Sequence, residues 1–486
     1  MSKQKTKLKK RFTDKKFKFY FYACVTIFFI LSVIILYYSF GYKYSIEDKK
    51  TVQIGAIVVK TEPKKSEIYI NGKLFKNNLL VNLLSDYTKI ENLSPKTYNV
   101  KVEKNNYFSW EKNIEVEGGY ITELKNIVLL KNNYKNKILL NGIIASTGLN
   151  NIRVSNDKNK IAYQKIDEEK LNISIFDIKD NKQKIVINPD ILSLEKCRDY
   201  NFDNIIWSND DTKIILRVNC DGNYSRYLID LKNKNRIYKL DAILNPTRKI
   251  ENGWNFYFDK SLFYLKNDSL YKLDYDKLKS EKIIADISGF SIIGDCVYYF
   301  KMGNNNLYST NYFKSDTPKK IFTMNDNFDS NSSSKIVRSG KNTYFVLSKS
   351  GNLYFVNENN KILFINSFIK NAHFSNNDKR IIYSNDHEIW IYYIYEKTFQ
   401  PSKKEHTNEL ITRYSGIISN IFLYKDNEHL FYKEGGVFKF IEIDNRDRVN
   451  IFSVLKLEGN DIFYSRDNNS IYYAENNKLM QIELDE

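Results

Sequence analysis

Residues 207–216 read WSNDDTKIIL. An aromatic residue and a serine lead into a turn rich in Asn and Asp, and a basic residue then starts an apolar strand. The pattern recurs in three further clear copies, at residues 154–163, 374–383 and 464–472, and in four weaker ones, at 257–264, 293–299, 339–345 and 424–432. These eight copies start 35 to 53 residues apart, and such spacing predicts an array of similar structural units.

A second turn and another strand follow most copies, as in SLYKLD at 269–274 and EIWIYY at 388–393. Each unit is then a small antiparallel sheet that cannot bury both faces alone. Sheets arranged radially pack face to face, and closure of the ring protects their edges. We therefore predict an all-β fold in which residues 135–486 form a β-propeller of seven or eight blades. Residues 139–144 are expected to pair with the last unit and close the ring.

The repeat resembles the TolB-like and WD40-like β-propellers, whose blades carry a Trp-Ser-Pro-Asp-Gly-Lys turn. Trp207-Ser208-Asn209-Asp210 matches that turn best, but its Pro and Gly are absent from every copy. The Asp residues are expected to cap the hairpins through side-chain-to-backbone hydrogen bonds. Calcium binding is the alternative, although the sequence has no D-x-[DN]-x-[DN]-G loop.

Residues 19–40, FYFYACVTIFFILSVIILYYSF, carry no charge. A helix of this length spans a hydrocarbon core of about 30 Å, and tyrosines near both ends suit the membrane interfaces. The basic residues before the run place the N-terminus in the cytoplasm. Because no Ala-x-Ala pattern follows, we expect an uncleaved signal anchor at 19–42 after a basic cytoplasmic tail at 1–18. A cleaved signal peptide and a buried core helix are the alternatives.

The net charge of +17 is concentrated at the N-terminus. Residues 1–18 contain eight Lys, one Arg and one Asp, which gives +8, so the other 468 residues share +9. A charge spread this thinly argues against a nucleic-acid partner. The expected location is the cell membrane, with one pass through the lipid bilayer at 19–42 and most of the chain extracytoplasmic.

Residues 53–130 alternate between apolar and polar positions, with turns between the runs. EIYI at 67–70 leads into Asn71-Gly72, a strong hairpin signal, and TYNVKVEK at 97–104 alternates throughout. We predict a small β-sandwich-like domain.

This domain resembles the PEGA family through IYINGK at 68–73, LSPKTYNVKV at 93–102 and NNYFSW at 105–110. Lys96 and Asn106 stand where that family usually has Gly, and PKKS at 63–66 replaces its naming motif. The resemblance implies a domain outside the membrane on an envelope protein.

No catalytic motif is present: the sequence lacks a G-x-S-x-G elbow, H-E-x-x-H, a Walker loop and Cys-x-x-Cys. His373, His387, His406 and His429 have no ligand spacing. We therefore predict no catalytic residue, no metal and no cofactor, and a protein that is not an enzyme.

Cysteine spacing gives one expectation that the structure can check. If the turn near Asp210 joins two antiparallel strands, position 220 faces roughly position 200, and Cys220 lies near Cys197. An outward-facing compartment would allow these two to form a disulfide, and two buried free thiols are the alternative. Cys24 falls in the membrane segment, and Cys296 is expected in the core.

The preferred interpretation is a membrane-anchored extracytoplasmic envelope protein with a binding or scaffolding role. Its propeller would present a recognition surface to an envelope protein or a cell-surface glycan. The alternative is an extracytoplasmic glycan-acting enzyme, a lyase or hydrolase, with its site in the propeller channel. Carboxylates clustered on the innermost strands would favour that enzyme. A third interpretation is a sensor whose tail at 1–18 contacts a partner, although its lysines suit anionic lipid headgroups as well.

Overall fold

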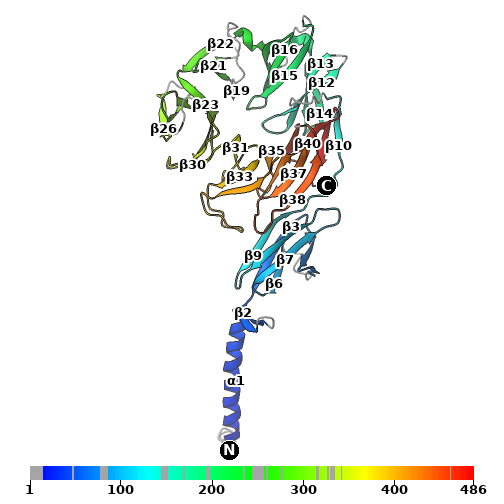
Figure 1. The fold of residues 1–486 in the computed structure, drawn as a ribbon, viewed down its shortest axis with the longest axis vertical. Helices are drawn as coiled ribbons and strands as arrows, with labels where there is room; N and C mark the ends of the chain where they lie inside the picture. The colour runs from blue at the N-terminus through cyan, green and yellow to red at the C-terminus, as the bar shows by residue number, and fades with distance from the viewer. Residues whose placement is uncertain are drawn as a thin grey trace, which may run out of the picture. The chain divides into compact units, whose positions relative to one another are not determined.

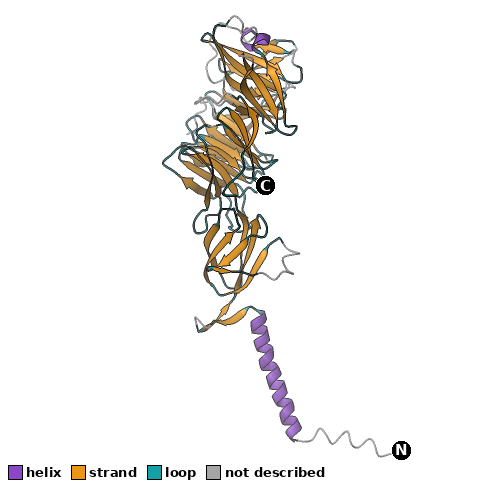
Figure 2. Cartoon of the chain, turned by 90° about the vertical axis from the view of Figure 1, so that its right-hand side faces the viewer, coloured by secondary structure: helices purple, strands orange, loops and turns teal. Residues whose placement is uncertain are grey.

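A computed structural model describes residues 15–45, 49–76, 86–143, 152–167, 170–192, 197–233, 236–243, 257–258, 261–274, 277–312, 317–325, 328, 334–340, 342–459 and 461–485. The described residues are nearly all β, as expected (Figure 2). The chain divides after Leu130 into two compact units, and the first also includes residues 398–402 and 444–450.

Helix α1 (Lys15–Ser39) is the one helix in the described ranges that is long and apolar enough to cross a membrane. A membrane anchor and a signal sequence both meet this description. The helix ends before residue 42, where we expected the anchor to end. Gly41 takes a φ of +79°, which a helix cannot continue, and Tyr42 already belongs to a strand. Residues 1–14 of the basic tail lie outside the described residues.

In the described residues of the first unit, the β structure consists of two small sheets and one hairpin. The hairpin pairs β1 (Tyr42–Ser45) with β2 (Lys50–Gln53). One sheet has the order β6-β3-β9, from Thr88–Leu93, Gly55–Glu62 and Ile121–Val128; the other has the order β5-β4-β7-β8, from Lys73–Leu74, Glu67–Ile70, Lys96–Glu103 and Trp110–Val116. Their apolar faces enclose a core that includes Ile57, Val100 and Trp110.

The turns of the first unit follow the local sequence. Asn71 and Gly72 both have positive φ and join β4 to β5, so the predicted hairpin is confirmed. Asn106 adopts a φ of 67°, the left-handed conformation that Gly often supplies. Strands β3 and β9 pair in parallel, which the alternating pattern did not predict.

Residues 398–402 and 444–450 contact the strands of the first unit through hydrogen bonds. The Gln400 side chain accepts a hydrogen bond from Glu123 N (2.9 Å) and donates one to Ile121 O (3.0 Å) on β9. Lys112 of β8 is fully buried, and its ammonium donates to the backbone oxygen of Asp444. The buried cation thus has a local acceptor.

In the second unit, the described residues form eight four-stranded sheets (Figure 1). We number the sheets along the chain and list the strands of each from the innermost to the outermost. Sheet 1 contains β11 (Ile152–Val154), β12 (Lys160–Asp167), β13 (Lys170–Asp177) and β14 (Lys182–Ile187); sheet 2 contains β15 (Tyr200–Trp207), β16 (Lys213–Cys220), β17 (Asn223–Asp230) and β18 (Ile237–Lys239). Sheet 3 contains β19 (Tyr257–Phe258), β20 (Leu262–Lys266), β21 (Ser269–Asp274) and β22 (Lys279–Ile284); sheet 4 contains β23 (Ile287–Ile293), β24 (Cys296–Lys301), β25 (Asn306–Asn311) and β26 (Lys319–Thr323).

The remaining sheets follow the same order. Sheet 5 contains β27 (Ser334–Arg338), β28 (Tyr344–Ser348), β29 (Leu353–Val356) and β30 (Ile362–Asn366); sheet 6 contains β31 (Asn371–Phe374), β32 (Arg380–Ser384), β33 (Glu388–Tyr393) and β34 (Asn408–Arg413). Sheet 7 contains β35 (Ile418–Leu423), β36 (His429–Glu434), β37 (Val437–Glu442) and β38 (Ile451–Lys456); sheet 8 contains β39 (Ile462–Ser465), β40 (Ser470–Glu475), β41 (Lys478–Glu483) and β10 (Lys137–Asn141). Short helical turns at Pro189–Leu192 and Leu240–Ile243 (α3) follow sheets 1 and 2.

The sheets close into a ring, which makes the second unit a β-propeller. Strand β10 pairs with β41, from Lys137 opposite Gln481 to Asn141 opposite Lys478. Sheet 8 also packs on sheet 1, because Tyr163 and Tyr472 belong to one buried cluster. The predicted closure by the N-terminal strand is therefore confirmed, although Ile144 lies outside the described residues.

Each of the eight predicted repeats falls at the start of one sheet, with its turn at or next to the link between the first and second strands. In sheet 2, the Ser208 hydroxyl accepts a hydrogen bond from Lys213 N at 2.9 Å. The Asp211 carboxylate instead reaches back to the turn of sheet 1, where it accepts from Asn156 N and Asp157 N, both at 2.8 Å. These contacts support a structural role for the turn acids.

Removing the Asp211 carboxylate should weaken the link between sheets 1 and 2. We expect Asp211→Ala to lower the free energy of unfolding by about 1–3 kcal/mol, because two backbone N–H groups lose their acceptor. Asp211→Asn keeps one oxygen and tolerates the φ of 53° at this position, so it is the matched control. Urea unfolding of the full-length chain in detergent measures the free energy of unfolding of both variants. An equal decrease in Asp211→Ala and Asp211→Asn would contradict the prediction.

Candidate functional site

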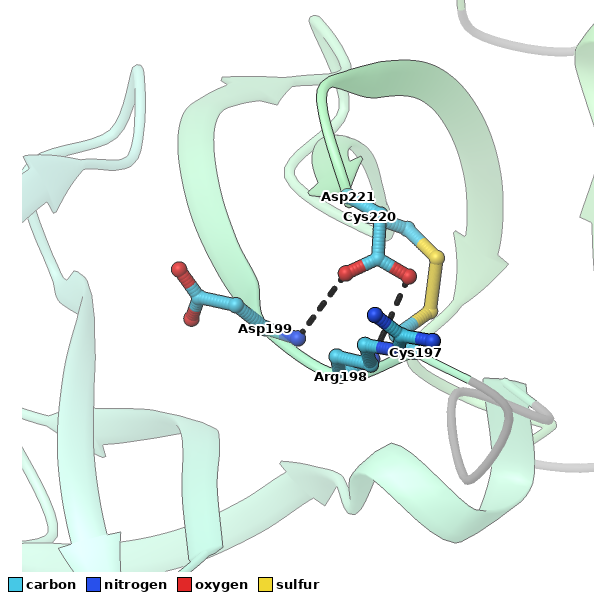
Figure 3. The surroundings of a disulfide bond; sticks show 5 residues. All are labelled: Cys197, Arg198, Asp199, Cys220 and Asp221. Carbon is cyan, nitrogen blue, oxygen red and sulfur yellow. Dashed lines mark hydrogen bonds between the residues drawn. A yellow bond between two sulfur atoms is a disulfide. The ribbon is translucent and has the colours of Figure 1, made fainter.

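The predicted cysteine pair lies at the edge of sheet 2 (Figure 3). Strands β15 and β16 place Tyr200 directly opposite Cys220, which confirms the predicted register. Cys197 and Cys220 are joined by a disulfide, with their Cα atoms 5.5 Å apart. The Asp221 carboxylate accepts hydrogen bonds from Arg198 N (3.2 Å) and Asp199 N (3.0 Å) (Figure 3). The disulfide and this carboxylate tie residues 197–199 to the β16–β17 turn.

The two other cysteines are free thiols. Cys24 lies in α1, as the sequence predicts, and is exposed. Cys296 begins β24 and is half-buried, so it lies at the margin of the core and not within it as expected.

The four histidines lie apart and have different surroundings. His387 Nδ1 lies 3.1 Å from Gly416 O, and His406 Nδ1 lies 2.8 Å from the Tyr392 hydroxyl. Within the described ranges, no group of three or more His, Cys, Asp and Glu side chains is arranged to hold a metal ion.

His429 is buried beside an acid. Its Nδ1 lies 2.6 Å from Asp426 Oδ2, and its ring stacks on Phe440. Burial by itself lowers the pKa of His429, but the Asp426 carboxylate outweighs burial and the net pKa is raised. His429 is buried at the start of β36, whereas Asp426 lies in the β35–β36 turn and is partly exposed.

The innermost strands of the sheets carry few acids. In the part of the chain that the structure describes, Asp203 of β15 is the one carboxylate on the first strands of the eight sheets, and it pairs with Arg217. Basic groups on the same strands are Arg153, Lys335, Arg338 and His373. The clustered carboxylates that would favour a channel enzyme are therefore not found in these strands.

A pocket of about 170 Å³ lies between sheets 5 and 6. Its lining residues are Thr343, Phe355, Asn357, Glu358, Asn359, Ile394, Tyr395, Glu405 and His406. Phe355 and Ile394 are buried and form an apolar floor, whereas Glu358 and Glu405 are exposed. No Lys or Arg contributes to this lining, although the chain as a whole is basic.

The polar groups of the pocket are partly oriented by one another. The Tyr395 hydroxyl donates to Glu358 Oε1 at 2.9 Å, and burial together with this carboxylate raises the pKa of Tyr395 to about 12. Tyr395 therefore stays a neutral hydrogen-bond donor at neutral pH. An aromatic ring beside amides and carboxylates can hold a sugar ring or a polar side chain.

Apart from Phe355 of β29, the lining residues come from connections at one face of the ring. Thr343 lies in the β27–β28 turn, residues 357–359 lie in the β29–β30 turn, and residues 394–406 belong to the β33–β34 connection. In an antiparallel sheet, the first and third connections lie at the same end of the strands. Sequence reasoning missed these residues, because polar turns of similar composition recur in every sheet.

No protein-family model matches the sequence, and no curated protein matches it. Similar solved structures include the β-propeller domain of Cps50 (Swd1) from Myceliophteria thermophila, with 10% identity, a TM-score of 0.38, and coverage of 72% of this chain and 99% of that chain. The Dos1 propeller has 14% identity, a TM-score of 0.44, and coverage of 72% and 94%. An oligogalacturonate lyase in complex with manganese has 11% identity, a TM-score of 0.36, and coverage of 66% and 96%. At these identities the likeness concerns the fold alone, so the propeller assignment rests on the sheet order.

Proposed function

We propose that this chain is a membrane-anchored, non-enzymatic envelope protein whose propeller binds a protein or a glycan outside the cytoplasm. In this proposal α1 and the residues to 42 anchor the chain, with residues 1–18 in the cytoplasm. Residues 53–130 form a PEGA-like stalk, and the eight sheets of residues 135–486 are eight blades.

The pocket between sheets 5 and 6 is the observation that carries the binding role. It opens among exposed turns, and it offers an apolar floor, one aromatic donor and two carboxylates. Recognition sites combine a mostly apolar cavity with a few placed polar groups in this way. The enzyme alternative has less support, because acids do not cluster on the described innermost strands.

Two further features support the extracytoplasmic placement. Disulfides persist in oxidising compartments, and Cys197 and Cys220 lie in bonding geometry. The PEGA-like assignment is supported by the Asn71-Gly72 hairpin and by the left-handed turn at Asn106, where that family usually has Gly.

The test is co-sedimentation of the full-length protein in detergent with purified cell-wall polymer, over a salt series, alongside capture from solubilised membranes. We expect saturable binding to one of the two that Tyr395→Ala with Glu405→Gln weakens at least fivefold. The control is Phe368→Ala, because Phe368 is 79% exposed and lies outside the pocket. Binding that the pocket variant leaves unchanged would move the recognition surface elsewhere; no saturable binding to either material would overturn the proposed role.

A further inference from the structure

A lysine and a histidine from neighbouring sheets lie near each other on the first strands of those sheets. Lys335 is on β27 and His373 is on β31, the first strands of sheets 5 and 6. The Lys335 ammonium donates to the backbone oxygen of Ala372 at 3.4 Å, and Ala372 directly precedes His373. This contact places the ammonium near His373, on whose imidazole its charge acts.

Among the described residues, no carboxylate acts on either group. Burial lowers the pKa of Lys335, and no carboxylate acts to raise it. Burial, followed by the charges of Lys335 and Lys158, lowers the pKa of His373 to about 4. Across the described residues, neither Lys335 nor His373 forms an ion pair.

The two lysines reach solvent and do not belong to a packed core. Both Lys335 and Lys158 expose their side chains to solvent, yet burial lowers the pKa of each. Both ammonium groups are therefore accessible to a dissolved anion. Lys158 belongs to the β11–β12 turn of sheet 1, and Asp467 of sheet 8 partly offsets its charge.

Two other cations of the propeller, by contrast, share a carboxylate. Arg380 and Lys397 are both buried, and the Glu428 carboxylate contacts both of them. Burying a charge is costly unless a partner compensates it, and this chain supplies such a partner at Glu428. Lys335 differs in being exposed, and in the described part of the chain no carboxylate pairs with it.

We propose that Lys335 and His373, with Lys158 nearby, form a binding site for an oxyanion group, either a phosphate or a carboxylate. The anion would accept hydrogen bonds from the Lys335 ammonium and from an imidazole N–H of His373, and it would supply the missing negative charge. The site shares no residue with the pocket between sheets 5 and 6, so either proposal stands without the other.

The experiment measures binding of inorganic pyrophosphate and of citrate to the full-length protein in a nonionic detergent, by calorimetry at pH 7 over a salt series. We expect one-to-one binding of at least one anion, weakened at least tenfold by Lys335→Gln and by His373→Asn. Lys349→Gln removes an exposed charge from the β28–β29 turn of sheet 5 and should leave the affinity unchanged. The anion that binds with the higher affinity then shows whether the site prefers phosphate or carboxylate.

Thermal unfolding separates loss of the site from loss of the fold. Without anion, Lys335→Gln should unfold at the same temperature as the parent or higher, because it removes an uncompensated charge. The parent should gain stability when the anion is added, and the variant should not. No saturable binding of either anion would overturn the proposal, and so would equal losses in Lys335→Gln and Lys349→Gln.

Discussion

Glu428→Gln is expected to lower the free energy of unfolding by about 3–5 kcal/mol, because it leaves two buried cations without their counter-charge. Glu428 Oε2 accepts a hydrogen bond from Lys397 Nζ at 2.8 Å, and Oε1 pairs with the Arg380 guanidinium. All three side chains are less than a tenth exposed. Because Arg380 lies on β32 of sheet 6 and Glu428 directly precedes β36 of sheet 7, the loss falls on the contact between two sheets.

Chemical unfolding followed by far-UV circular dichroism measures this loss in the full-length chain. Glu396→Gln is the matched control, because Glu396 is the exposed neighbour of Lys397. A change of less than about 0.5 kcal/mol is expected for this surface substitution. If the two variants unfolded at the same denaturant concentration, Glu428 would not be the stabilising counter-charge that its contacts indicate.

Loss of the disulfide is expected to lower the free energy of unfolding by about 3 kcal/mol, because the bond closes a loop and so restricts the conformations of the unfolded chain. Cys197 and Cys220 are separated by 23 positions, and Cys220→Ser removes the bond while leaving Asp221 to hold the segment at residues 198–199. Cys296→Ser, which removes a free thiol, serves as the control.

Thermal unfolding with and without a reducing agent tests the bond itself. The reductant should lower the unfolding temperature of the parent and of Cys296→Ser, and it should leave Cys220→Ser unchanged. A parent whose unfolding temperature does not respond to the reductant would contradict the expectation that Cys197 and Cys220 are bonded in the protein as isolated.

The sequence predicts the propeller well because its turns are local. Asp211, Asp378 and Asn427 all take positive φ at the same place in their turns, so each repeat can be recognised in the sequence from a few residues. Even the weak copy at 424–432, which has Tyr in place of Ser, opens a sheet. The pairing of Tyr200 with Cys220 across two strands follows from the same turn geometry.

Features that depend on distant packing are not predictable in this way. The parallel pairing of β3 with β9 joins strands that are far apart in the sequence, and alternation gives no direction of pairing. Lys335 and His373 are single basic residues on short strands, and they lie near each other only because sheets 5 and 6 are neighbours. Glu358 and Tyr395 are likewise brought together by two different sheets.

Because sheet 8 combines strands from both ends of the propeller sequence, the ring can close only after its last strand, β41, has been made. Strand β10 is made before the strands of every other sheet of the ring, yet its partner β41 ends only at Glu483. A nascent or prematurely terminated chain that lacks β41 has an unclosed ring with a free strand edge at each end. Such edges readily pair with another chain, so a chain cut short before β41 should self-associate more than the closed ring does.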